Sequence, residues 1–282
     1  MRDKRFTLVH ALAAAGISVA AALMTLLPVT ALAQATPGVP PAQAAAMGAY
    51  KATHDTDPHL ADTTSSALRS SRLQSSGALT AAVQTALPAS RLLGKNQQAQ
   101  ANGYYCGPAA VKEAMGLLGN SNYSQSAEAT ALKTTSSSGT AWSGVNANVP
   151  ARFLTGHPVR DVIEAEAYAS FNYDAYYSVI SVPYTPKASD TSNYIASLTI
   201  DMNTGFPMVG DAWEVAGYAH LTGHPKNQTI FHWFTIIGYE NSGASTSYED
   251  SATSIWTTVP AYTLNFSSST LVLILGGRGY IW

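Results

Sequence analysis

The sequence predicts an α+β domain over residues 96–282, because helical patterns come first along it and strand patterns follow. Pro108 to Leu118 and Ser124 to Leu132 have the composition and terminal residues of helices. Pro207 to Trp213 and Thr229 to Tyr239 are apolar runs rich in aromatic and β-branched residues, as expected of strands. A repeating βαβ sheet would instead alternate the two patterns throughout.

The predicted helices have recognisable ends. Pro108 suits a first helical turn, and Gly119–Asn120 is a stop signal for the helix that it begins. A later helix is expected from Ser189 to Asn203, before Gly205. The pattern from Val159 to Ala169 is compatible with either a helix or a strand.

The remaining strand patterns lie in the second half of the domain. Ser178 to Pro183 has a strand composition, and Ser245 to Glu249 is expected to pair with Thr229 to Tyr239 as a hairpin. A capped helix from Ser267 to Leu275 is expected to end at the glycine-rich segment Gly276–Gly279.

The N-terminus has the three parts of a signal peptide, predicted over residues 1–33. A basic start precedes an apolar run from Phe6 to about Leu27, and Ala31–Ala33 supplies the small residues that a signal peptidase needs. A membrane anchor is disfavoured because polar residues interrupt the run and Pro28 ends it. We therefore expect a secreted, extracellular protein, free or associated with the cell wall, with no stable membrane anchor after cleavage.

Residues 34–95 differ in composition from the rest of the chain. They begin with an Ala/Pro/Gln-rich stretch, and Thr63 to Ser76 is rich in Ser and Thr. Such segments bury too little apolar surface to offset the entropy of ordering them. We expect a linker or a pro-segment, partly disordered, with short helical patterns at Ala42–Thr53 and Leu79–Leu87.

Charge argues against nucleic acid as a partner. The net charge is −2 at pH 7 and only 11% of residues are charged. Loss of residues 1–33 would change the net charge to about −4, and no cluster of Lys and Arg follows them.

The chain has a single cysteine, Cys106. Cysteines of exported proteins usually come in pairs, so a lone thiol is a buried side chain, half of an intermolecular disulfide or a reactive group. Cys106 stands just before a predicted helix, whose N-terminal N–H groups and dipole favour a thiolate. Gly107 would leave room for a substrate backbone. Gln100, six residues upstream, could donate a hydrogen bond to an oxyanion beside the Cys106 N–H.

His232 is the candidate base for this thiol. It lies inside an apolar strand, where an unpaired histidine is unfavourable, whereas the other histidines lie in the signal peptide, the weakly ordered segment or predicted loops close to Gly or Pro. Its partners would be a backbone carbonyl or Tyr hydroxyl, or else Cys106 and a carboxylate. The predicted hairpin would bring Asp250 back near His232, where an orienting carboxylate is needed.

His220 and His224 have the i, i+4 spacing of a metal-binding pair. Gly223 and Pro225 argue against a helix there, so no metal site is predicted. No organic cofactor is expected either.

Three motifs in order resemble those of papain-like cysteine peptidases related to the double-glycine bacteriocin-leader peptidases, the C39-like peptidases. The resemblance covers about residues 96–282. Members commonly have Asp-Pro-Ala at the last motif, where this chain has Asp-Ser-Ala, and Glu249 and Glu240 remain alternatives to Asp250. The matching positions are Gln100 and Cys106-Gly107-Pro108, then His232-Trp233 and Gly238-Tyr239, then Tyr248, Asp250 and Ala252.

The resemblance implies a papain-like fold, with the nucleophile helix packed on an antiparallel sheet that carries His and Asp. It implies hydrolysis of peptide or related amide bonds in a peptide or protein substrate. By position it makes Cys106 the nucleophile, Gln100 the oxyanion donor, His232 the base and Asp250 its orienting partner. Transpeptidation and deamidation would use the same residues. The alternative is a non-catalytic papain-like module that binds peptides or a cell-surface partner.

Overall fold

The computed structural model describes residues 39–57 and 87–282, except 173 and 176. These described residues belong to one compact unit. The predicted signal peptide lies outside them, as does nearly all of the helical pattern at Leu79–Leu87. Among the described helices, none has the length and apolar character needed to cross a membrane.

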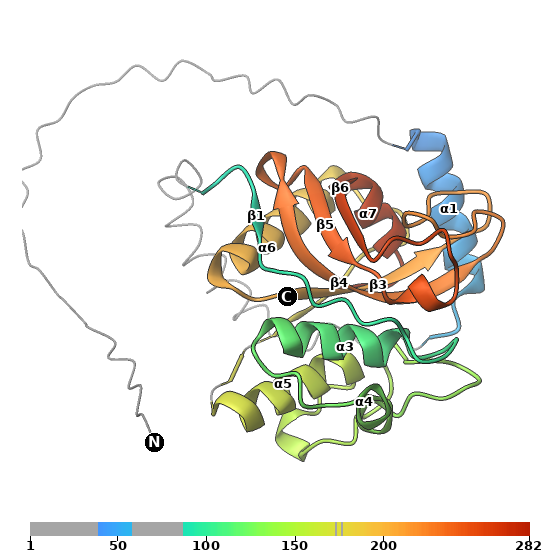
Figure 1. Cartoon of the computed structure of the whole chain (residues 1–282). Helices are drawn as coiled ribbons and strands as arrows, with labels where there is room; N and C mark the ends of the chain where they lie inside the picture. Colours follow the sequence, from blue (N-terminus) through green and yellow to red (C-terminus); the bar gives the residue numbers. More distant parts are fainter. Residues whose placement is uncertain (1–38, 58–86, 173, 176) are drawn as a thin grey trace, which may run out of the picture. The chain divides into compact units, whose positions relative to one another are not determined.

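A seven-stranded antiparallel sheet forms the centre of the fold (Figure 1). Its order is β2-β7-β3-β4-β5-β6, and β1 pairs with the end of β4. The two long central strands, β3 and β4, pair from Met208↔Ile236 to Glu214↔Ile230. The strands are β1 (Arg91–Leu92), β2 (Val179–Ser181), β3 (Met208–Glu214), β4 (Ile230–Glu240), β5 (Ser245–Glu249), β6 (Tyr262–Ser267) and β7 (Gly279–Ile281).

Helices cover both faces of this sheet. The helices α3, α4 and α5 lie together on one side in Figure 1, and α6 and α7 lie on the other. Each face of the sheet has a hydrophobic core, and successive residues of β4 contribute to the two cores in turn. Trp233 packs in the core with α3 and α5, and Phe234 packs in the core with α6 and α7. This explains why β4 is apolar along nearly its whole length. The helices are α1 (Pro41–His54), α3 (Cys106–Leu117), α4 (Gln125–Leu132), α5 (Pro158–Phe171), α6 (Ala188–Thr204) and α7 (Ser268–Leu275).

The predicted α+β class is confirmed, and each predicted helix and strand of residues 96–282 has a counterpart. The ambiguous pattern at Val159–Ala169 is the helix α5, which begins with Pro158 and ends at Asn172 in a left-handed conformation. The sequence did not reveal β1, β6 or β7. The segment Gly276–Gly279 does end α7, but its last residue starts β7, where a Cβ would collide with the Ile180 carbonyl.

The helix α1 confirms the pattern at Ala42–Thr53 and packs against the domain. Lys51 is fully buried and its Nζ donates to the carbonyls of Leu273, Ile274 and Gly276 at 3.0, 3.0 and 2.7 Å. These carbonyls belong to the C-terminal end of α7, where helical acceptors have no partner within the helix. Burial lowers the pKa of Lys51 well below its usual value. The roles of residues 34–95 as linker or pro-segment stay predictions.

Two buried glutamates make the stability of the fold depend on pH. Burial raises the pKa of Glu128 on α4 to about 7, and burial and Glu128 raise that of Glu166 on α5 to about 10. In the unfolded chain both carboxyls ionise at the ordinary pKa of glutamate, whereas the folded chain keeps them protonated to higher pH. The free energy of unfolding is therefore highest at low pH and falls as the pH rises towards the two raised pKa values.

Glu166→Gln should therefore flatten the pH dependence of stability. We expect the melting temperature of the wild type to fall between pH 5 and pH 9, and the variant to be more stable at pH 8 by about 1–3 kcal/mol. Thermal unfolding followed by circular dichroism across this range measures both. Parallel curves for the two proteins would contradict the assignment of the slope to this pair.

Candidate active site

Cys106 is the first residue of α3 and keeps 9% of its surface exposed, so it is not sealed inside the core. Tyr105 provides the N-cap position without a side-chain hydrogen bond to the helix. Gly107 allows close packing within the protein, because a Cβ there would collide with the side chain of Thr140. Room for a substrate backbone at this glycine stays a prediction.

His232 lies on β4, which packs directly against α3. Its Nε2 is 2.9 Å from Oδ1 of Asp250, which leaves Nδ1 for the Cys106 thiol. Burial lowers the pKa of His232, but the charge of Asp250 and hydrogen bonds to Asp250 and Cys106 outweigh it and hold this pKa well above its usual value. The structure thus brings together three of the four predicted residues in the order thiol, imidazole, carboxylate.

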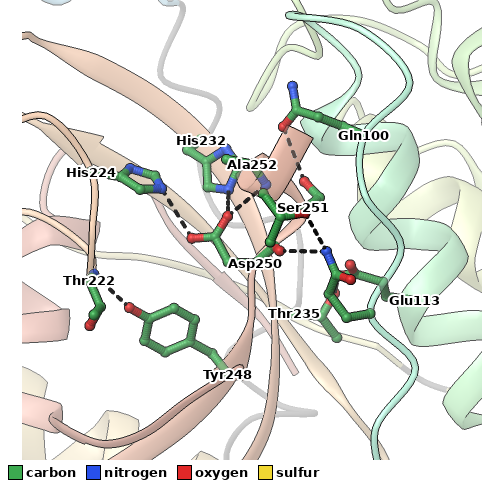
Figure 2. Close-up of polar contacts among 12 residues, drawn as sticks. Gln100, Glu113, Thr222, His224, His232, Thr235, Tyr248, Asp250, Ser251 and Ala252 are labelled. Carbon is green, nitrogen blue, oxygen red and sulfur yellow. Dashed lines mark hydrogen bonds and ion pairs between the residues drawn. The ribbon is translucent and has the colours of Figure 1, made fainter. Parts of the chain in front are cut away.

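Asp250 follows directly after β5, and the hairpin of β4 and β5 carries it back to His232, as predicted. Figure 2 shows its carboxylate between two imidazole rings, those of His232 and His224. Oδ1 also accepts the backbone N–H of Ala252 at 2.8 Å. Burial raises the pKa of Asp250, but the two histidines outweigh it and hold the pKa well below its usual value. Asp250 is therefore a carboxylate at any pH near neutrality.

The two alternative carboxylates face elsewhere. Glu249 accepts the backbone N–H of Asn96, and burial raises its pKa to about 7. Glu240 ends β4, opposite Ser245 and towards the other end of the hairpin from Asp250. Asp250 is thus the carboxylate that contacts His232.

Gln100 is buried beside the turn that follows Asp250. Its backbone N–H donates to the Ser251 carbonyl at 2.8 Å, and the Ser251 hydroxyl donates to Gln100 Oε1 at 3.2 Å (Figure 2). Gln100 Nε2 donates to the Asn102 carbonyl at 2.7 Å, and its second N–H remains for another acceptor. The serine of Asp-Ser-Ala, where relatives commonly have proline, therefore orients the side-chain amide of Gln100.

His224 and Glu214 are site residues that the sequence analysis missed. His224 Nε2 is 3.0 Å from Asp250 Oδ2, and its Nδ1 is 2.7 Å from Glu214 Oε1. The ring nitrogens of His220 face the carbonyls of Tyr218 and Gln228 at 3.0 and 2.8 Å, and its Nε2 is also 3.8 Å from Glu214. The i, i+4 spacing singled out both histidines as a metal-binding pair, but it did not predict the contact of His224 with Asp250.

In the described part of the chain, one group of side chains has donor atoms close enough to share a cation. It comprises His224, His232 and Asp250, all buried, with atoms within 4.8 Å of one another. The same nitrogens and oxygens already meet at hydrogen-bond distances of 2.9 and 3.0 Å. A cation could bind only by replacing the N–H protons of these bonds, so we describe the group as hydrogen-bonded.

A cavity of about 270 Å³ lies beside the segment Ser181–Tyr184. Its wall includes Trp142, whose ring stacks on Trp233, the neighbour of His232, at 5.7 Å between centroids. None of the four predicted site residues lines it. The rest of its lining is Ser181, Val182, Pro183, Tyr184, Gly277 and Arg278.

A thiol at the start of a helix, packed on an antiparallel sheet that presents imidazole and carboxylate, is the arrangement of a papain-like peptidase fold. The sequence model described as Peptidase_C39 like family matches residues 93–268, and the chain belongs to this family. The predicted resemblance is thereby confirmed, and membership points to a cysteine peptidase that acts on peptide or protein substrates. A comparison with curated proteins gave no match.

Proposed function

We propose that the protein is an exported cysteine peptidase that hydrolyses peptide or related amide bonds. Cys106 is the nucleophile, His232 the general base and acid, Asp250 the orienting carboxylate and Gln100 a donor to the oxyanion. The observation that carries this proposal is the 2.9 Å contact with Asp250 made by His232 on β4, the strand that packs against α3, which begins with Cys106. Family membership supports the reaction class, and the signal peptide predicted over residues 1–33 supports export.

The proposed reaction passes through a thioester. The Cys106 thiolate attacks the carbonyl carbon of the scissile amide, and the carbonyl electron pair moves onto oxygen. When the C–N bond breaks, His232 gives its Nδ1 proton to the leaving amine. A water molecule then attacks the thioester and gives a proton to His232, which releases the carboxylic acid product and restores the thiolate.

Two N–H donors are available for the oxyanion in this scheme. The second N–H of Gln100 Nε2 is not used by Asn102, and the Cys106 N–H belongs to a helix N-terminus, where donors have no partner within the helix. Each such donor contributes about 3–4 kcal/mol to lowering the barrier in comparable sites. Ser251 supports this role because its hydroxyl donates to Gln100 Oε1. This hydrogen bond orients the amide so that Nε2 is the end available to donate to an oxyanion.

Thiol reactivity tests the proposal without knowledge of the substrate. The chain from Gln34 to Trp282 is alkylated at its single thiol with iodoacetamide across pH 4–10, alongside His232→Ala. We expect rapid alkylation of the wild type near pH 6, and in the variant a rate that rises only near the ordinary thiol pKa of about 8.5. Identical profiles for the two proteins, both rising near pH 8.5, would show that the Cys106 thiol is not activated and would favour a peptide-binding module.

A further inference from the structure

Behind Asp250 lies a second pair of buried ionisable groups that a Cys-His-Asp mechanism does not require. Glu214 is the last residue of β3, and His224 lies in the connection between β3 and β4. Both side chains are fully buried. They extend the site into a row of four groups, Glu214, His224, Asp250 and His232, with contacts of 2.7, 3.0 and 2.9 Å.

The contacts of His224 define its protonation. Both ring nitrogens face carboxylate oxygens, and a neutral ring would turn a lone pair towards one of them. His224 is therefore an imidazolium. The contact with Glu214 has the length of an ion pair but not the alignment of a hydrogen bond, so charge holds it more than direction. Burial lowers the pKa of His224, but Asp250 and Glu214 outweigh burial and raise it overall.

Charges then alternate along the row. His224 is faced by Glu214 from β3, by Asp250 after β5 and by His232 from β4, with ring centroids of the two histidines 5.0 Å apart. Other groups complete its surroundings: the Trp256 ring lies 4.9 Å away, and His220 Nε2 is 3.8 Å from Glu214. The positive charge of His224 has two effects at Asp250. It holds Oδ2, so that Oδ1 faces His232, and it offsets part of the negative charge that His232 experiences.

We propose that His224, held by Glu214, is a positioning residue that orients the Asp250 carboxylate and sets the upper pH limit of the charged Cys106–His232 pair. The catalytic part of this inference rests on the proposed function. The electrostatic part concerns His232 alone and can be measured whether or not the thiol is reactive.

The electrostatic part is tested by NMR titration of the His232 ring in the Cys106→Ala background. His232 is assigned from the resonance that is lost in a His232→Gln variant. His224→Gln removes the positive charge but keeps a donor for Asp250, so His232 should titrate about 0.5–1 pH unit higher. Glu214→Gln favours neutral His224, and its shift should have the same sign and be smaller. An unchanged or lowered His232 titration in His224→Gln would overturn the proposal.

The positioning part is tested by the alkylation profile with the thiol present. In His224→Gln the imidazolium of His232 should lose its proton only at higher pH, so the alkaline limit of the alkylation profile should move to higher pH. The alkylation rate of this variant at pH 6 should stay within several-fold of the wild-type rate. His224→Ala loses the donor as well, and its rate at pH 6 should fall about 10–100-fold. Recovery of that rate by Gln distinguishes orientation of Asp250 from a purely structural role, and equal rates for Ala and Gln would contradict it.

Tyr248→Phe is the matched control. The Tyr248 hydroxyl accepts the Thr222 N–H at 2.9 Å and so holds the segment that carries His224 (Figure 2), but the substitution changes no charge in the row. We expect a lower melting temperature and an unmoved titration of His232. A shift equal to that of His224→Gln would show that loosening of this segment, and not the charge of His224, controls His232, and would overturn the proposal. A wild type without rapid alkylation near pH 6 would instead contradict the proposed function, and the NMR result would stand independently.

Discussion

Cys106→Ala should abolish hydrolysis, with a loss in kcat on the order of 10⁶-fold. The thiol is the atom that forms the covalent bond, and the chain has no second cysteine to replace it. His232 and Asp250 have no nucleophile to activate once the thiol is gone, so Cys106→Ala/His232→Ala should lose no more than Cys106→Ala alone. Turnover of a quenched fluorescent peptide library measures these rates.

The loss of hydrolysis can be assigned to the missing thiol only if Cys106→Ala folds as the wild type does. Alanine is smaller than cysteine and apolar, and Cys106 lies at the edge of the core that α3 and α5 share, so we expect a melting temperature close to that of the wild type. Cleavage by Cys106→Ala at more than about one hundredth of the wild-type rate would show that the hydrolysis has another source and would exclude Cys106 as its nucleophile.

Asp250→Asn has the second-largest expected effect, a fall in kcat/KM of about 10³–10⁴-fold. The amide preserves the shape of the side chain but removes the charge that raises the pKa of His232. The thiolate–imidazolium pair should therefore persist only to a lower pH, so the alkaline limit of the rate profile moves down. This direction is opposite to that expected for His224→Gln, because the two substitutions remove charges of opposite sign from the surroundings of His232.

Glu249→Gln is the control for this prediction. Glu249 is the adjacent residue in the chain and is also buried, but it faces the backbone of Asn96 rather than His232. Burial raises its pKa to about 7, so glutamine resembles the form that it has at mildly acidic pH. We expect nearly unchanged kcat/KM at pH 6. If Asp250→Asn had the same rate and pH profile as Glu249→Gln, the result would contradict the role of Asp250 in orienting His232.

Local sequence patterns were enough to predict the elements that carry the candidate site. The helix at Cys106 has a proline in its first turn and a glycine–asparagine stop, and β4 is an apolar run of strand-forming residues. His232 stood out because a histidine inside such a run needs a partner. Asp250 followed from the expected hairpin, since the turn at Asn241–Gly243 determines which residues return to the start of β4.

Short segments without periodicity could not be assigned in this way. A strand of three residues such as β7 gives too few positions for alternation to show, and its place between β2 and β3 depends on pairing with residues far away in the chain. Lys51 lies in a stretch of weakly apolar composition, and only the open carbonyls at the end of α7 show why an amine is buried there. Composition alone suggested only a linker or pro-segment around it.

The sequence by itself determined the α+β class, the family relationship and the identity of Cys106, His232, Asp250 and Gln100 as candidates. The hairpin also predicted that Asp250 lies near His232, but the packing of Cys106 beside His232 and the addition of Glu214 and His224 behind Asp250 were decided only by the tertiary structure. Periodicity and capping residues report interactions between neighbours in the chain, which the sequence displays directly. A charge pair between the end of one strand and a connecting loop depends on the register of the sheet and on burial, which arise only when distant segments pack together.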